Sequence, residues 1–194
     1  GAAVDPVTRS LRLVGPASSS SSNQNETCNL KRTFSSAGNR KIYTVAFWVK
    51  RSSISNAKQI LFSSGGSGDS NTNEISFRSN DTLEFYLYPS TSMSRLATAA
   101  KFRDVSAWYH VTVAVDTTQA TAANRVKMFV NGVQQTFETH TTYPDQNDQS
   151  HFNDNREHKF GEEQHRNRYN AEVLLADCYF IDGSAIEPVG NFIE

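Results

Sequence analysis

The segment that decides the fold is Ala107–Glu138, with the sequence AWYHVTVAVDTTQATAANRVKMFVNGVQQTFE. From residue 108 to residue 116, apolar and more polar side chains alternate with a period of two, which predicts a half-buried β-strand. A second alternating run, residues 126–130, is joined to a third by Asn131-Gly132, the dipeptide most typical of a tight hairpin because both residues accept positive φ. Strands that follow one another without an intervening helix indicate a sheet-built binding scaffold rather than a nucleotide-binding α/β enzyme.

Composition sets the limits on size and partners. The chain has 194 residues, enough for one sizeable core, so we expect a single domain over residues 1–194. Nineteen Lys and Arg against 20 Asp and Glu give a net charge of -1, which favours neither nucleic acid nor an anionic membrane. No apolar run approaches the roughly 20 residues of a membrane helix, and no secretory leader pattern is visible. We therefore predict a soluble chain without a nucleic-acid partner and without membrane insertion.

The same period of two recurs along the rest of the chain. The predicted strands are residues 10–14, 27–34, 41–51, 59–63, 74–78, 83–88, 96–102, 108–116, 126–130, 133–137, 158–161 and 171–182. Strand 41–51 is expected to be central, because Ala46 and Trp48 make its second face apolar as well. The serine run 18–22 and the polar region 138–170 are expected to be loops. The prediction is an all-β antiparallel sandwich.

The chain contains two cysteines, Cys28 and Cys178, which exclude a disulfide framework. In many sandwiches the terminal strands are neighbours, so a Cys28–Cys178 bond is one possibility. The alternative is a pair of free thiols that behave as small apolar residues. The sequence does not decide between them.

A family resemblance rests on five motifs in a fixed order. They are Ser35–Lys41 (SSAGNRK), Phe47–Arg51 (FWVKR), Ala107–His110 with Val115–Gln119 (AWYH and VDTTQ), Val130–Gln135 (VNGVQQ) and Phe180–Gly183 (FIDG). Together they resemble a laminin-G-like domain of the concanavalin A-like jelly-roll superfamily, in the form found in structural proteins of tailed bacteriophages and environmental viruses. The resemblance extends from about Ser10 to Glu194.

The resemblance implies a two-sheet jelly-roll sandwich and a non-enzymatic virion structural or surface protein, such as a capsid decoration, head-fibre or tail-fibre protein. Its partners would be other virion proteins and itself, as a homo-oligomer with a trimer favoured. The alternative is a carbohydrate-binding adhesion module for host surface polysaccharide. A third reading is an extracellular eukaryotic laminin-G-like module, in which the sequons at Asn25 and Asn80 would accept glycans. The mixed charges of 138–170 suit protein contacts and favour the virion role.

Enzymatic members of the superfamily place two glutamates and an aspartate on one strand face as Glu-x-Asp-x-x-Glu, since glycoside hydrolysis needs two carboxylates. No such string occurs here. Glu162 and Glu163 are adjacent, and Glu172 and Asp177 are five positions apart, so each pair points to opposite faces of an extended chain. We expect these residues to be solvated or structural, and we predict no catalytic residues.

Histidines and loop carboxylates are the candidate metal ligands of the sequence. His151, His158 and His165 repeat every seven residues, with His140 upstream, but they lie in a polar segment without helical periodicity, so they are read as loop residues. His110 is read as structural. Calcium is the more plausible ion, because relatives bind it with loop oxygens. The available donors are Asp69, Asn71, Asp145, Asn147, Asp148 and Asp154. No ligand and no resident cofactor is assigned from them.

Glycan binding calls for an exposed aromatic ring beside amides and carboxylates, because a sugar has an apolar face and a hydroxyl rim. Trp48 and Trp108 lie in apolar strands and are read as packing residues. Tyr143 and Tyr169 are the loop aromatics that remain. Tyr143-Pro144 can equally serve to fix a long loop to the sandwich.

Overall fold

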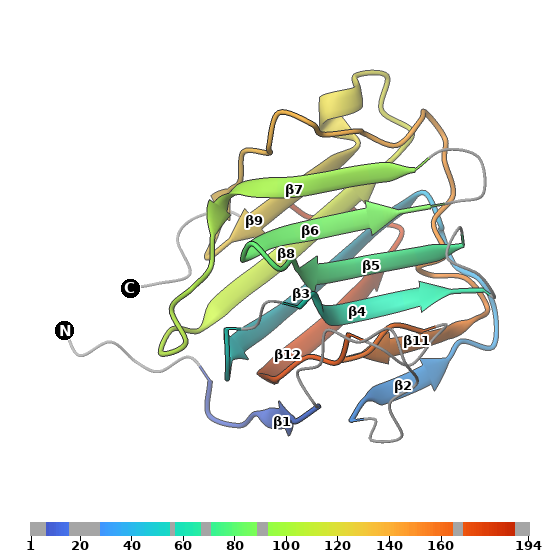
Figure 1. Ribbon diagram of the computed structural model, residues 1–194. Helices are drawn as coiled ribbons and strands as arrows, with labels where there is room; N and C mark the ends of the chain where they lie inside the picture. The colour runs from blue at the N-terminus through green and yellow to red at the C-terminus, as the bar shows by residue number, and fades with distance from the viewer. Residues whose placement is uncertain are drawn as a thin grey trace.

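A computed structural model describes residues 7–15, 28–54, 57–66, 71–88, 93–164 and 169–188. The serine run 18–22 that was predicted to be a loop lies outside these residues, as do Asn25, Asp69 and His165. Two layers of strands lie face to face, with β4–β7 in front and β3, β8, β9 and β12 behind in the view of Figure 1. Among the described residues the only helix is the short 3₁₀ turn η1 (Ala122–Asn124).

The strands lie close to the predicted positions. They are β1 (Leu11–Leu13), β2 (Leu30–Thr33), β3 (Ile42–Arg51), β4 (Gln59–Gly65), β5 (Thr72–Phe77), β6 (Thr82–Leu87), β7 (Ser94–Lys101), β8 (Tyr109–Asp116), β9 (Val126–Val130), β10 (Val133–Gln134), β11 (Glu157–Phe160) and β12 (Val173–Asp182). The order in the first sheet is β1-β12-β3-β8-β9-β10, and in the second it is β2-β11-β4-β5-β6-β7. All the strand pairs within both sheets are antiparallel. The predicted fold class is confirmed.

The core lies between the sheets and follows from the alternation within each strand. β3 supplies Tyr43, Val45, Phe47 and Val49, all fully buried, to the inner face of the first sheet. Its outer face carries Trp48, which packs against His110 of the neighbouring strand. β3 is therefore a central strand, as predicted from its two apolar faces.

The hairpin prediction is confirmed by backbone geometry. Asn131 and Gly132 join β9 to β10 with φ of 52° and 78°, the left-handed pair that a type I′ turn requires. A second hairpin joins β5 to β6 through Asp81, whose φ is 69°. The side chain of Asp81 meets the buried Arg51 in an ion pair of 2.9 Å. That turn therefore connects to the interior of the sandwich.

The strand predicted at 133–137 is wrong beyond Gln134. The chain leaves the first sheet there and runs along β7, the edge strand of the second sheet. Backbone bonds join Ala99 to Thr136 and Ala97 to Glu138, and Arg95 and Thr142 exchange two bonds. Because an uncovered edge strand offers unpaired donors and acceptors, this crossing segment protects that edge.

The polar region 138–170 is not the solvated loop that its composition predicted. Its middle, Ser150–Asp154, is buried, and Phe152 is a fully buried part of the core.

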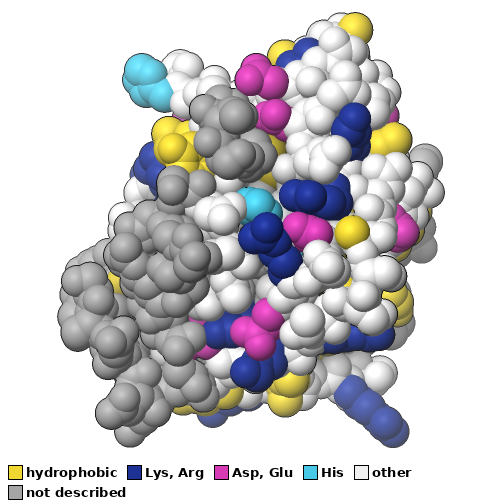
Figure 2. Space-filling model, turned by 90° about the vertical axis from the view of Figure 1, so that its right-hand side faces the viewer, with side chains coloured by type: hydrophobic (Ala, Val, Ile, Leu, Met, Phe, Trp, Pro, Cys, Tyr) yellow, Lys and Arg dark blue, Asp and Glu magenta, His cyan; other side chains and the backbone are white. Residues whose placement is uncertain are grey.

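The reading of Trp108 as a packing residue within a strand is also corrected, because it precedes β8 and is only partly buried. The mixed-charge surface predicted for 138–170 is only partly present, because Asp154, Lys159, Glu162 and Glu163 are buried and Arg166 and Arg168 lie outside the described residues. On the face of the molecule seen in Figure 2, basic and acidic side chains interleave.

Strand β12 contains an irregularity that the sequence did not reveal. Its register against β3 slips between Ala176 and Tyr179, which inserts one extra residue, and Asp177 has a φ of 46°. Such a bulge reverses which side chains face the core. Before it Leu175 points inward, and after it Phe180 does, stacked on Tyr43 with ring centroids 5.5 Å apart.

No helix in the described residues has the length and apolarity of a membrane span.

Candidate functional site

A groove lies at the side of the sandwich where the two sheets do not close. β2 is the last strand of the second sheet, and β1 pairs only with residues 173–175 of β12. The part of β12 beyond its bulge therefore faces β2 without a strand between them. The groove has a volume of about 530 Å³, within the usual range of small-ligand pockets.

Aromatic side chains form the apolar wall of the groove. Phe34 follows β2 and stacks on His158 of β11 with ring centroids 4.2 Å apart. Phe160 and Phe62 lie beside them, and Phe180 contributes from β12. These rings are inner-face residues of strands that lack a partner strand across the sandwich. Phe34, Phe160 and Phe180 are consequently left partly open to solvent, whereas Phe62 and His158 are buried, and Tyr179 at the rim is 59% exposed.

Polar groups meet at one end of the groove. The side-chain amide of Asn153 donates to Asp182 Oδ1 at 2.6 Å and to the carbonyl of Asn39 at 3.1 Å. The backbone N–H of Asn39 donates to the same carboxylate oxygen at 2.7 Å. Gly38 allows this approach, since a Cβ at that position would lie 2.5–2.6 Å from Asn153 and Asp182 atoms. The result is an ordered carboxylate and amide beside aromatic rings.

His158 connects the aromatic wall to the polar end. Its Nε2 accepts the backbone N–H of Asn153 at 3.1 Å, which requires that nitrogen to be unprotonated. The Nδ1–H therefore donates to the carbonyl of Arg156 at 2.9 Å. Burial lowers the pKa of His158 below its usual range. A neutral imidazole with both nitrogens engaged thus holds Asn153 in place.

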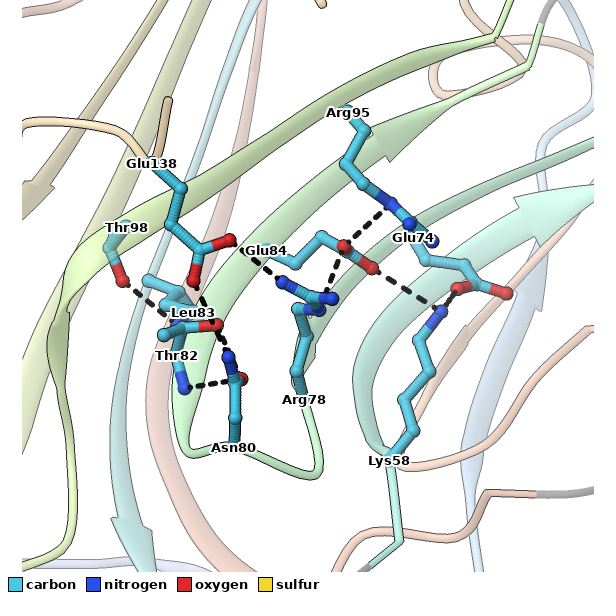
Figure 3. Close-up of polar contacts among 10 residues, drawn as sticks. All are labelled: Lys58, Glu74, Arg78, Asn80, Thr82, Leu83, Glu84, Arg95, Thr98 and Glu138. Carbon is cyan, nitrogen blue, oxygen red and sulfur yellow. Dashed lines mark hydrogen bonds and ion pairs between the residues drawn. The ribbon is translucent and has the colours of Figure 1, made fainter. Parts of the chain in front are cut away.

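A second polar cluster covers the outer face of the second sheet (Figure 3). Glu84 on β6 contacts Arg95 at 2.9 Å, Arg78 at 3.3 Å and Lys58 at 3.7 Å. Lys58 also pairs with Glu74 on β5, and Arg78 pairs with Glu138 of the crossing segment at 3.0 Å. Sequence reasoning missed this cluster, although the predicted hairpin places Glu74 and Glu84 on the same sheet face.

The contacts of this cluster favour a structural network over an acid–base pair. Burial alone would lower the pKa of Lys58, but the charges of Glu74 and Glu84 raise it above its usual value. Both carboxylates are therefore paired with cations in the same way. Nothing marks one of them as a proton donor and the other as a nucleophile. The network joins three strands and the segment that covers β7.

The carboxylates considered from the sequence are dispersed. Glu162 and Glu163 are buried, so the solvated reading is wrong for them and the structural one applies. Glu162 accepts Asn29 Nδ2 at 2.6 Å and pairs with Lys159 at 3.3 Å. Glu172 accepts a hydrogen bond from Ser53, and Asp177 is exposed at the bulge of β12.

The histidines and the calcium donors do not converge either. Within the described ranges, no group of three or more His, Cys, Asp or Glu side chains is placed to hold a metal ion. Asp154 pairs instead with Arg40 at 3.5 Å and with Arg156 at 2.9 Å. Asp145 and Asp148 lie in one turn, where the backbone N–H of Asp145 donates to Asp148 Oδ2 at 3.0 Å. His151 and His158 are buried, which corrects their reading as solvated loop residues, while His140 is exposed.

Tyr143 packs against the core and meets Phe137 edge to face with ring centroids 6.1 Å apart. This contact favours the structural alternative, in which Tyr143 fixes the loop. Tyr169 is half-buried, and its carbonyl accepts the backbone N–H of Ile60. The aromatic residues of the groove are Phe34, Phe62, Phe160, Tyr179 and Phe180, which the sequence analysis assigned to strands but not to a site. Cys28 and Cys178 are both free, Cys28 half-buried and Cys178 exposed in the groove lining.

The fold is a jelly-roll sandwich with a groove at its side, and comparisons with known proteins identify its family. A laminin G family model, described as the concanavalin A-like lectin/glucanases superfamily, matches residues 23–173. The chain belongs to this superfamily, which confirms the laminin-G-like, concanavalin A-like part of the predicted resemblance. A comparison of the sequence with curated proteins gives no match.

Solved structures share the fold at low sequence identity. A heptameric SAP-like pentraxin from Limulus polyphemus has a TM-score of 0.54 and 15% identity over 82% of this chain and 72% of its own. A botulinum neurotoxin type C structure, described by its interaction with two ganglioside molecules, has a TM-score of 0.58 and 16% identity over 86% of this chain and 39% of its own. NanB in complex with Optactamide has a TM-score of 0.56 and 16% identity, over 81% and 26%. This chain spans only a minor part of the last two proteins.

Proposed function

We propose that the protein is a non-enzymatic carbohydrate-recognition module and that the groove between β2 and β12 is its binding site. The observation that carries this proposal is the combination of an open aromatic wall with an ordered Asn153–Asp182 pair. An aromatic ring stacks against the apolar face of a sugar, and a fixed carboxylate and amide bind its hydroxyl groups. The superfamily and the ganglioside-binding toxin support this reading.

The side chains that line the groove are held in place by contacts within the protein before a ligand binds. His158 and Gly38 fix the polar end, and the aromatic wall belongs to strands that are paired within their sheets. A ligand therefore meets groups that are already ordered, which lowers the entropy cost of association. A volume of about 530 Å³ suits one or two sugar rings.

The test is binding of the purified chain to a glycan panel, followed by titration of the best ligand. Replacing the exposed Tyr179 by Ser is expected to weaken binding about tenfold or more, because it removes an aromatic contact at the rim. Val133→Ser is the matched control, since Val133 is 54% exposed on the opposite edge strand β10. Equal affinities for both variants and the parent chain, or no glycan binding at all, would contradict the proposal.

We further propose that this recognition takes place at the surface of a virus particle, with the chain assembled as a homo-oligomer, a trimer being favoured. Two observations support assembly. The edge strand β1 exposes Leu11, with Val14 beside it, and the outer surface mixes charges of both signs, as protein contacts do. Light scattering of the purified chain, with and without calcium, tests this: a closed oligomer is expected, and a strict monomer in both conditions would contradict it.

A further inference from the structure

One basic side chain of β2 lies on the inner face of the second sheet, where apolar side chains are expected. Residues of β2 alternate between the two faces of the second sheet, so Leu30, Arg32 and Phe34 share a face. Leu30 pairs with Phe160 and Arg32 with His158 in the register of β2 and β11. This is the face that lines the groove, whose lining includes Arg32. A cation therefore occupies an inner-face position in an otherwise aromatic and aliphatic row.

The neighbouring lysine shows the contrasting arrangement. Lys31 also lines the groove, but it pairs with Glu157 at 3.3 Å. Arg32 forms no ion pair with any carboxylate in the part of the chain that the structure describes. Its guanidinium carbon lies 5.8 Å from the centroid of Phe34, the ring that stacks on His158. Asp182, which also lines the groove, is engaged by Asn39 and Asn153.

A guanidinium beside an aromatic platform matches a particular kind of ligand. Its planar fork binds carboxylate or sulfate oxygens through two parallel hydrogen bonds, and a partly enclosed apolar site strengthens such bonds. We propose, on the basis of the proposed glycan function, that the groove selects acidic saccharides and that Arg32 binds their anionic group. The sugar ring then rests on the aromatic wall, and its hydroxyl groups face Asn153 and Asp182.

The experiment compares glycans in matched pairs. Each pair consists of a neutral oligosaccharide and the same oligosaccharide carrying a sialic acid, a uronic acid or a sulfate. The acidic member is expected to bind about tenfold more tightly, as a charge-assisted hydrogen bond predicts. Comparing the carboxylated with the sulfated members identifies which anion Arg32 prefers.

Two variants decide the role of Arg32. Arg32→Gln is expected to abolish the preference for the acidic member while neutral binding changes less than about twofold. Lys101→Gln, which removes an exposed cation at the end of β7 on the opposite edge of the second sheet, is expected to retain the preference. Thermal unfolding of both variants checks that the groove remains folded.

The outcomes separate this inference from the proposed function. If neutral and acidic members bind equally well and Arg32→Gln has no effect, the acidic preference is refuted while glycan recognition stands. If Lys101→Gln loses the preference to the same extent as Arg32→Gln, general surface charge is responsible and the assignment to Arg32 is refuted. If no member of any pair binds, the proposed function fails and this inference with it.

Discussion

Removing Asp81 from its buried ion pair with Arg51 is expected to destabilise the protein more than removing Arg51 does. Arg51 has no exposed side-chain surface, and its Nη1 donates to Asp81 Oδ1 at 2.9 Å and to the carbonyl of Phe102 at 2.7 Å. Its guanidinium also lies over the ring of Phe77, 4.7 Å from the centroid. Asp81 is nearer the surface and has a second partner, Arg103, at 2.7 Å.

Removing either partner leaves a different charge behind. Asp81→Asn retains the shape and the tolerance of positive φ but leaves the Arg51 cation buried without a counter-charge, at a cost of about 3–4 kcal/mol. Arg51→Met leaves Asp81 paired with Arg103 near solvent, so about 1–2 kcal/mol is expected. The double variant has no buried charge to compensate and should be more stable than Asp81→Asn alone.

Urea unfolding followed by tryptophan fluorescence measures the three free energies, against a total of about 5–15 kcal/mol for an ordinary domain. Arg103→Gln is the control on the exposed partner and should cost less than about 1 kcal/mol. The reasoning is refuted if Asp81→Asn costs less than about 1 kcal/mol, or if the double variant is less stable than that single variant.

Three further predictions concern pH, the groove and the thiols. Burial, with Arg156 and Arg40 nearby, lowers the pKa of His151 to about 4. As the pH falls from 6.5 to 4, the unfolded chain therefore binds a proton at this residue before the folded chain does, and the stability should fall. Urea midpoints measured against pH test this, and His151→Gln should flatten the curve. Gly38→Ala should displace the Asn153–Asp182 pair, cost about 1–3 kcal/mol and weaken glycan binding, and unchanged titrations would contradict the role given to Gly38. Thiol titration of the denatured, unreduced chain should find both cysteines free, and a Cys28–Cys178 disulfide in a peptide map would contradict the structure.

Much of the fold could be predicted because its signals are local. Each strand buries one face, so the alternation in β8 and β9 appears directly in the sequence, and Asn131-Gly132 marks the turn that follows. Central strand β3 was recognised for a related reason, since apolar side chains on both faces indicate cover on both sides.

The candidate site could not be predicted because it depends on contacts distant in sequence. Asn153, Asp182 and Asn39 meet only after three separate segments have been placed. Asn39 and Asp182 belong to the motifs Ser35–Lys41 and Phe180–Gly183, but those motifs indicated a family and not a contact, and Asn153 belongs to none of them. Composition also misled the reading of 138–170, because its polar residues are hydrogen-bonded inside the molecule rather than solvated. One clue was available: Arg32 interrupts an apolar face of its strand, as expected of a residue retained for binding rather than packing.

The bulge of β12 gives the groove a degree of independence from the rest of the molecule. On one side of it, residues 173–175 are locked between two strands and fill the core, while on the other side Tyr179 and Phe180 form the rim and wall of the groove. One residue inserted or deleted at Asp177 would exchange the orientations of Tyr179 and Phe180 without moving Leu175. A change in length at this position would therefore alter the lining of the groove and leave the core packing of Val173 and Leu175 in place.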